Sequence, residues 1–304
     1  LGGGLLVGMG VSACGMPVLL GAVGKVAPEE KRSTWLALVA VGATAGQLAI
    51  IPCAQALVTA QGWSIALLAL SVCFVLGLPI AYWMGAAADR VVASKPKSNT
   101  TAQNLTQAVV EARGHSGFIL LTIGFFVCGF QVQFIITHLP AFIQDQGFGP
   151  QFGSNALVII AGCNMVGAWF AGYLGDRYSK KYILACIYVL RAIAITIFMV
   201  APISELSILV FCGVIGLIWL GTVPLTSGIV AQIFGARFMS TLFGIVFLSH
   251  QLGNFAGAWV GGFVFDTTGS YTAVWWFAAG LGVIAALFHV PIDDRPVQRL
   301  AATQ

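Results

Sequence analysis

Strongly polar side chains inside long apolar runs are the groups of this sequence that could do chemistry. At membrane depth such groups are costly, so they usually face a cavity or a partner helix. Gln131, Phe134 and His138 are spaced to share one helical face, which we expect to line a solute pathway. His138 is a candidate proton carrier, because the ordinary pKa of histidine, about 6.5, lies close to working pH. An equally good interpretation is that His138 caps a helix end beside Pro140.

Arg191 is the most costly of these groups, because a charge near a helix centre costs about 3 kcal/mol or more. In one role it would hold a substrate carboxylate or an acidic side chain through a bidentate pair. In the other role it would make a structural pair with a carbonyl or carboxylate of a neighbouring helix. Residue type and position leave both roles open.

A second polar cluster lies in the run 238–265, where His250, Gln251 and Asn254 occur close to its middle. The amides could belong to a substrate site, or could act as hydrogen-bonding glue worth about 1 kcal/mol. Asn164 is a lesser candidate of the same kind, and so is Thr222. Glycines recur at every fourth position of the run, a spacing that lets a neighbouring helix approach closely. These are Gly253, Gly257 and Gly261.

Metal, cofactor and enzyme chemistry are not expected. The four histidines are distributed along the chain, and the seven cysteines occur singly in apolar runs without the short spacings of metal sites. A membrane enzyme would need a cluster of His, Asp or Cys near one interface. We therefore expect no metal, no cofactor and no enzymatic activity.

The elements that must position the polar groups are membrane-spanning helices. Of the 304 residues, 59% are hydrophobic and only 8% are charged, against about 25% in a soluble domain. This composition excludes a soluble, disordered or nucleic-acid-binding protein, and the long apolar runs exclude an outer-membrane barrel. A spanning helix needs about 20 apolar residues, and we expect nine such segments. In order they are Leu5–Val26, Thr34–Thr59, Trp63–Trp83, Phe118–Phe142, Asn155–Tyr173, Tyr182–Val200, Leu206–Ala231, Phe238–Phe265 and Thr272–Val290.

The distribution of charge orients these segments. With nine spans, thirteen of the fourteen Lys and Arg residues fall on one side, whereas the loops on the other side hold only Asp145, Glu205 and Asp266. The positive-inside rule assigns the basic side to the cytoplasm. The polar stretch from Gly85 to Ser116 then becomes a cytoplasmic linker between two helical bundles, and residues 293–304 become a cytoplasmic tail.

An internal repeat relates the two ends of the chain at an offset of 207 residues. The aligned pairs include Pro17 and Pro224, Ser33 and Ser240, Thr34 and Thr241, Gly46 and Gly253, and Gln47 and Asn254. The two prolines predict matching hinges, because each removes a helix hydrogen bond, and amides at matching depth fit a central site. A parallel repeat of six helices implies twelve helices in all. We therefore expect three more helices, in roughly 90 residues, before Leu1, where the chain starts without a Met.

One loop resembles a known family. Gly172-Tyr173-Leu174-Gly175-Asp176-Arg177-Tyr178-Ser179-Lys180-Lys181 is similar to the G-x-L-A/G-D-R-x-G-R/K-R/K loop of the major facilitator superfamily, with Ser179 in place of the second glycine. The resemblance covers the whole chain as the family's helices four to twelve. It implies an all-α integral membrane fold of two six-helix bundles. The expected divisions are residues 1–84 for helices four to six, 85–116 for the inter-bundle loop, 117–292 for the C-terminal bundle and 293–304 for the tail.

The same resemblance gives the loop residues a role. Asp176 and the bases Arg177, Lys180 and Lys181 would bond to neighbouring helix ends and latch one conformation, or the bases would only enforce the topology. The position of Arg191 in the family's peripheral ninth helix favours its structural role.

Residues 133–147 and 240–271 resemble the seventh and eleventh helices of bacterial monocarboxylate and oxalate/formate transporters. This implies a small carboxylate substrate, moved by proton symport or anion exchange. Around Asn164 the chain departs from those carriers, which usually have an Arg in that helix. A drug/proton antiporter is the alternative, although the Gly-Pro-x-x-Gly-Gly sequence of that branch is missing after Gly46. A non-transporting membrane scaffold is a further alternative.

We therefore expect a secondary active transporter in the bacterial cytoplasmic (inner) membrane that works as a monomer by rocking of two halves. Its partners would be a small-molecule substrate, the lipid bilayer and protons, and not nucleic acid. The expected pathway residues are Gln47, Gln131, His138, Asn164, Thr222, His250, Gln251 and Asn254.

Overall fold

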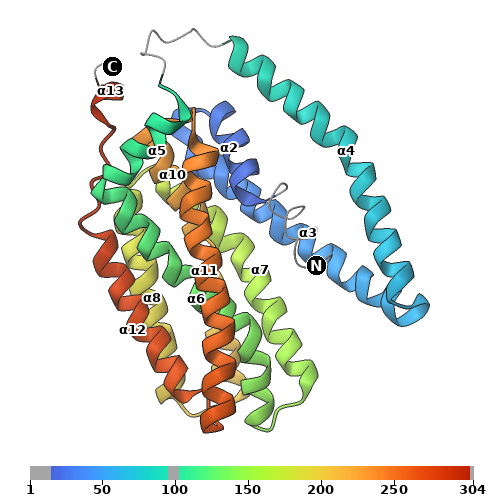
Figure 1. The fold of residues 1–304 in the computed structure, drawn as a ribbon. Helices are drawn as coiled ribbons and strands as arrows, with labels where there is room; N and C mark the ends of the chain where they lie inside the picture. Colours follow the sequence, from blue (N-terminus) through green and yellow to red (C-terminus); the bar gives the residue numbers. More distant parts are fainter. Residues whose placement is uncertain (1–14, 95–102, 302–304) are drawn as a thin grey trace.

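The computed structural model describes residues 15–94 and 103–301, and their regular elements are all helical, which confirms the all-α fold. The elements are α2 (Met16–Val26), η2 (Glu29–Lys31), α3 (Arg32–Gln61), α4 (Trp63–Ser94), α5 (Leu105–Gly114), α6 (Ser116–Asp145), α7 (Pro150–Gly175), α8 (Lys180–Val200), α9 (Glu205–Leu217), α10 (Thr222–Phe234), α11 (Met239–Thr268), α12 (Thr272–His289) and α13 (Gln298–Ala301). Figure 1 shows α6 to α12 as one bundle, with α2 and α3 against it and α4 leaning away.

The expected membrane spans are present as helices. Seven stretches of the described residues are long and apolar enough to cross a membrane: α3, α4, α6, α7, α8, α12 and the stretch Glu205–Phe234 that contains α9 and α10. α11 occupies the eighth expected segment and is 30 residues long. α2 occupies the first, whose beginning lies outside the described residues.

The expected seventh span, Leu206–Ala231, is not one continuous helix, and this corrects the sequence prediction. α9 ends at Leu217 and α10 begins at Thr222. A break leaves backbone N–H and C=O groups without helical partners, and inside a membrane other protein groups must satisfy them. The hydropathy pattern is continuous across residues 218–221, so it could not indicate the break.

The two repeat-related prolines lie at helix starts. Pro17 is in the first turn of α2, and Pro224 is in the first turn of α10, directly after the break. Proline is tolerated there because first-turn amides have no acceptor within their own helix. In the described residues, each proline therefore starts a helix, and the expected role of the two prolines as hinges stays a prediction.

The predicted linker from Gly85 to Ser116 is partly helical. α4 continues to Ser94, and α5 fills most of the second half of the linker. Asn104 starts α5 with reciprocal capping bonds: its side chain accepts from the Gln107 amide at 2.8 Å, and its own amide donates to the Gln107 side chain at 3.0 Å. Residues 95–102 lie outside the described part.

The glycine ridge of α11 packs closely against α6, as its spacing predicted. A Cβ added at Gly257 would lie 3.0 Å from the carbonyl carbon of Phe130, and one at Gly253 would lie 2.9 Å from the amide nitrogen of the same residue. At Gly261 an added Cβ would collide with the ring of His138. Backbone atoms cannot give way as a flexible side chain can, so this helix pair requires glycine.

Contacts between the repeat-related ends follow the repeat. Gly21 of α2 lies against Ser240 of α11, so that a Cβ on Gly21 would overlap the serine side chain. Gly228, its repeat partner in α10, faces Ser33 of α3, the repeat partner of Ser240. The N-terminal helices α2 and α3 therefore meet the C-terminal bundle at two repeat-related places, closely at Gly21 and in ordinary van der Waals contact with Ser33 at Gly228.

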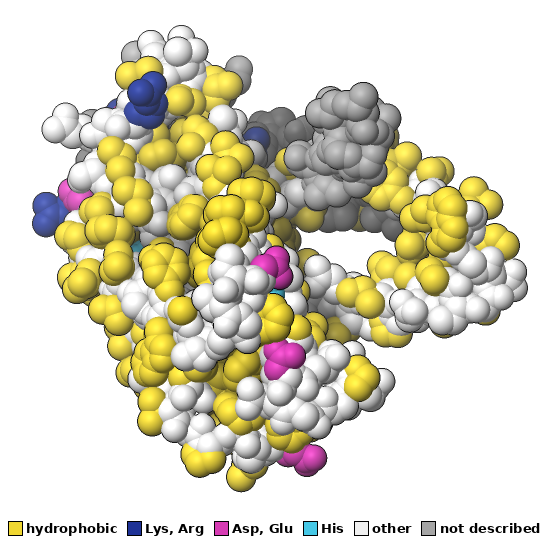
Figure 2. Space-filling model, turned by 60° about the horizontal axis from the view of Figure 1, so that its bottom comes forward, with side chains coloured by type: hydrophobic (Ala, Val, Ile, Leu, Met, Phe, Trp, Pro, Cys, Tyr) yellow, Lys and Arg dark blue, Asp and Glu magenta, His cyan; other side chains and the backbone are white. Residues whose placement is uncertain are grey.

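The α3–α4 arm leaves much apolar surface exposed. The buried residues of α3 all lie between Ser33 and Thr44, and large side chains of α4 such as Leu76 and Tyr82 are 68% and 82% exposed. Figure 2 shows open space between this arm and the rest of the molecule. An apolar surface of this size needs lipid or further protein around it.

Replacing Gly257 by Ala is expected to lower the free energy of unfolding by about 1–3 kcal/mol, because the added methyl overpacks the α6–α11 contact. Thermal unfolding in detergent measures the change. Gly262→Ala is the matched control on the same helix, since its nearest neighbouring atom would be 3.9 Å away. Equal unfolding temperatures for the two variants would contradict the close packing.

Candidate substrate pathway

Asp176 joins the two halves at the basic end of the bundle. It follows the last turn of α7, and its two carboxylate oxygens accept from the backbone amides of Ser33 at 2.7 Å and Thr34 at 3.0 Å. These amides belong to the first turn of α3, where a negative charge is favourable. Gly172 and Gly175 permit the approach, because a Cβ on either would collide with α3 or its neighbours.

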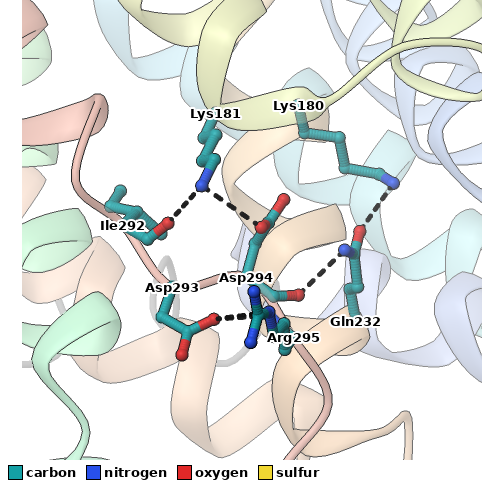
Figure 3. A network of polar contacts seen from close by, with 7 residues as sticks. All are labelled: Lys180, Lys181, Gln232, Ile292, Asp293, Asp294 and Arg295. Carbon is teal, nitrogen blue, oxygen red and sulfur yellow. Dashed lines mark hydrogen bonds and ion pairs between the residues drawn. The ribbon is translucent and has the colours of Figure 1, made fainter.

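The bases that follow Asp176 bond mainly within the C-terminal part (Figure 3). Lys180 Nζ donates to Gln232 Oε1 at 2.9 Å, and the Gln232 amide donates to the Asp294 carbonyl at 2.9 Å. Lys181 Nζ donates to the Ile292 carbonyl at 2.7 Å and pairs with the Asp294 carboxylate at 3.5 Å. The tail after α12 is thereby tied to α8 and α10.

Arg177 has a different environment from the two lysines. It is exposed, and its guanidinium lies 3.6 Å from the ring centre of Tyr173, one turn earlier in α7. The pair is a local cation–π contact at the end of the helix.

The break between α9 and α10 is held by Arg191 from α8. Its Nε and Nη2 donate to the Ile218 carbonyl at 3.0 and 2.8 Å, and Nη2 also donates to the Trp219 carbonyl. Nη1 reaches Gln131 Oε1 at 3.4 Å and Cys128 Sγ at 3.5 Å. All five guanidinium N–H groups have an acceptor. The cation therefore compensates the free carbonyls at the negative end of α9.

Asn164 from α7 serves the other side of the break. Its Oδ1 accepts from the Leu220 amide at 2.9 Å, and its Nδ2 donates to Thr44 Oγ1 of α3 at 3.0 Å. Asn164 is 1% exposed and Thr44 is 5% exposed. One amide thus connects the broken helix with the other half of the molecule.

The expected pathway face of α6 packs inside the bundle, which differs from the sequence prediction. Gln131 Nε2 donates to the Ala278 carbonyl of α12 at 2.8 Å, and His138 Nε2 lies 2.9 Å from the Ala258 carbonyl of α11. Both side chains are buried, as is Phe134 between them. Helical spacing showed that the three share a face, but neighbouring helices decide what that face meets.

The polar group of α11 lies partly at the surface. Gln251 is exposed, and its Oε1 accepts from Asn254 Nδ2 at 2.9 Å and lies 3.4 Å from His250 Nδ1. His250 is buried, with the rings of Phe125 and Phe247 centred 4.7 and 5.3 Å away. Its Nε2 has no hydrogen-bond partner among the described residues.

The remaining candidates do not form one cluster. Gln47 is exposed on α3, one turn beyond Thr44. Thr222 is buried, and its Oγ1 lies 3.1 Å from Cys128 Sγ. No group of three potential metal ligands occurs among the described residues.

Sequence analysis did not identify two residues of the buried polar network, Thr44 and Cys128. Thr44 was missed because a lone threonine carries no signal, although it aligns with Gln251 in the repeat. Cys128 was missed because a single cysteine in an apolar run carries no signal, yet it contacts both Arg191 and Thr222.

Replacing Arg191 by Gln is expected to lower the free energy of unfolding by about 2–3 kcal/mol, because buried carbonyls at the break would lose charged donors. Thermal unfolding in detergent measures the loss. Arg113→Gln, at an exposed position of α5, removes the same charge and should leave stability nearly unchanged. If both variants unfold alike, Arg191 does not hold the break.

Comparisons with known proteins agree with this architecture. The chain is 30% identical over 190 residues to the uncharacterized MFS-type transporter YcxA of Bacillus subtilis, covering 58% of this chain and 44% of that protein. It is 26% identical over 184 residues to monocarboxylate transporter 13 of Rattus norvegicus, covering 58% and 42%. It is 27% identical over 169 residues to the quinolone resistance protein NorA of Staphylococcus aureus, covering 54% and 42%. The matches thus span less than half the length of these relatives.

Solved structures share the fold. The E. coli fucose:proton symporter FucP superposes with a TM-score of 0.67 at 15% identity, over 88% of this chain and 71% of that one. The proton:xylose symporter XylE gives 0.64 at 18% identity, over 93% and 69%. The sequence model of the Major Facilitator Superfamily matches residues 1–169 and 150–304. The chain belongs to the major facilitator superfamily of membrane transporters.

Proposed function

We propose that this chain forms most of a secondary active transporter that works by alternating access, completed by three helices before Leu1. The observation that carries the proposal is the contact between the halves. They meet near the basic end through Asp176 and the amides of Ser33 and Thr34, and no residue of α3 beyond Thr44 is buried. An interface closed at one end and open at the other is what a rocking mechanism requires.

We assign the basic end to the cytoplasm of a bacterial cell, following the positive-inside rule. In that orientation the contact of Asp176 with α3 lies at the cytoplasmic end of the interface. The carboxylate of Asp176 is then a cytoplasmic latch, since it caps α3 only while the halves are together.

A small carboxylate is the substrate class that we propose. A carboxylate-bearing solute would meet no Asp or Glu deep in the described spans. The similarity to monocarboxylate transporter 13 supports the same class. His250 is the proposed proton carrier, because its buried Nε2 has no hydrogen-bond partner among the described residues and could accept a proton.

Drug export is the second candidate function, and the similarity to NorA over 169 residues favours it. It predicts transport of large apolar cations, whereas the carboxylate proposal predicts transport of small anions. The two proposals therefore differ in substrate charge and can be separated by one assay.

Counterflow in proteoliposomes tests the substrate class. The complete transporter is expected to exchange radiolabelled lactate, pyruvate or oxalate, and not a neutral sugar, because a carboxylate offers strong acceptors to buried amide donors. Exchange of a quinolone without any carboxylate would instead support drug export. Exchange of the sugar alone would contradict both proposals.

Replacing Asp176 by Asn is expected to weaken the latch, since one charged oxygen that accepts from an α3 amide becomes an NH2 group. Hydrogen exchange at the amides of Ser33 and Thr34 should accelerate about tenfold. The control is Asp145→Asn, which makes the same substitution at the exposed last residue of α6. Unchanged exchange in the Asp176 variant would show that the carboxylate does not hold the halves together.

A further inference from the structure

The buried part of α3, which packs against the bundle, ends at Thr44. The buried residues of this helix form a single stripe and stop at Thr44, whereas Ile50 and Ile51 beyond it are 54% and 63% exposed. The buried stripe is Ser33, Leu36, Ala37, Ala40 and Thr44. The hydrogen bond between Thr44 and Asn164 therefore lies at the last buried residue of α3.

The two hydrogen-bond partners of Asn164 lie in different halves of the molecule. Leu220 belongs to the same half as Asn164, and glycine contacts fix α7 against the broken helix there: a Cβ on Gly167 would collide with the Leu217 carbonyl. Thr44 belongs to the other half. Separation of the halves would keep the first bond and break the second.

Breaking the second bond leaves a specific group free. Thr44 gives its own hydroxyl proton to the Ala40 carbonyl at 3.1 Å, so it acts only as acceptor toward Asn164. When Thr44 withdraws, an Nδ2–H donor of Asn164 loses its acceptor. An unsatisfied donor in an apolar interior is costly, so this group requires a new acceptor.

Among the described residues, no charge close to Asn164 is left free to bind a substrate. The nearby cation, Arg191, already uses all its N–H groups on the break and its neighbours. Asn164 instead has one donor whose partner is lost when the halves separate.

We propose that Asn164 Nδ2 exchanges Thr44 Oγ1 for an oxygen acceptor of the substrate, a carboxylate or carbonyl oxygen. Asn164 then closes the interface while the site is empty and binds the solute once the halves separate at this level. This inference rests on the transport function proposed above. It makes Thr44 a competitor of the substrate and Asn164 a ligand of it.

Competition predicts effects of opposite sign for the two partners of one hydrogen bond. Thr44→Val removes the competing acceptor, so the state with a free donor gains population and a carboxylate should bind up to about fivefold more tightly. Asn164→Ala should weaken binding by at least about fivefold. If the bond were only structural glue, neither variant would strengthen binding.

The test uses the complete transporter and two measurements. Equilibrium binding of a radiolabelled carboxylate gives the affinity, and the distance between spin labels on unnatural amino acids at Glu30 and Tyr178 reports separation at the basic end. Thr44→Val should shift the labels toward longer distances. Thr122→Val is the matched control, because the Thr122 hydroxyl bonds only to Phe118 of its own helix.

Asn164→Ala also leaves the Leu220 amide unpaired and could unfold the protein, so Asn164→Asp is the second variant. It keeps an oxygen for Leu220 and lacks the amide donor. Weaker binding in Asn164→Asp, together with tighter binding in Thr44→Val, supports the proposal.

Weaker binding in Thr44→Val, or unchanged label distances in that variant, overturns it. If the unmodified protein binds no carboxylate, the proposed substrate class is wrong, and the label distances then decide the Asn164–Thr44 switch by themselves.

Discussion

The structure depends on the requirement that every backbone polar group inside a membrane find a partner within the protein. Continuous helices meet it automatically, but residues 218–221 do not continue a helix. Arg191 supplies donors to the carbonyls on one side of the break, and Asn164 supplies an acceptor to an amide on the other. Two side chains from two neighbouring helices thus make an otherwise costly irregularity stable, and they fix α7, α8 and the broken helix relative to one another.

The molecule uses two kinds of helix contact, and they differ in where the glycines and the hydrogen bonds lie. α6 and α11 touch through glycines with backbone against backbone, and the contact between His138 and the Ala258 carbonyl lies in the same interface. α3 and α7 meet through glycines as well, but hydrogen bonds from Asp176 and Asn164 mark the two ends of that contact. A transporter needs both kinds, because its halves must stay rigid while the contact between them opens.

The internal repeat gives the interface its symmetry. Gly21 meets Ser240 in one crossing, and the equivalent residues Gly228 and Ser33 meet in the other. Asymmetry enters through side chains that the repeat does not share. Thr44 aligns with Gln251, and of these two residues Thr44 is the one bonded to Asn164.

Composition, hydropathy and the repeat by themselves determined that the chain is a helical membrane protein with an internal repeat, because apolar length and glycine spacing depend on local sequence only. The resemblance to the major facilitator superfamily came from the Asp176 loop. The resemblance of the Asp176 loop also predicted a contact with a helix end, and the structure gives that end as the start of α3. What only the tertiary structure decided is the partner of each buried polar group. Gln131 and His138 turn into the bundle, Arg191 reaches carbonyls of a helix break that hydropathy cannot detect, and Asn164 meets a threonine distant in sequence. A hydrogen-bond partner is set by which helices pack together and at what rotation, and no periodicity within one helix contains that information.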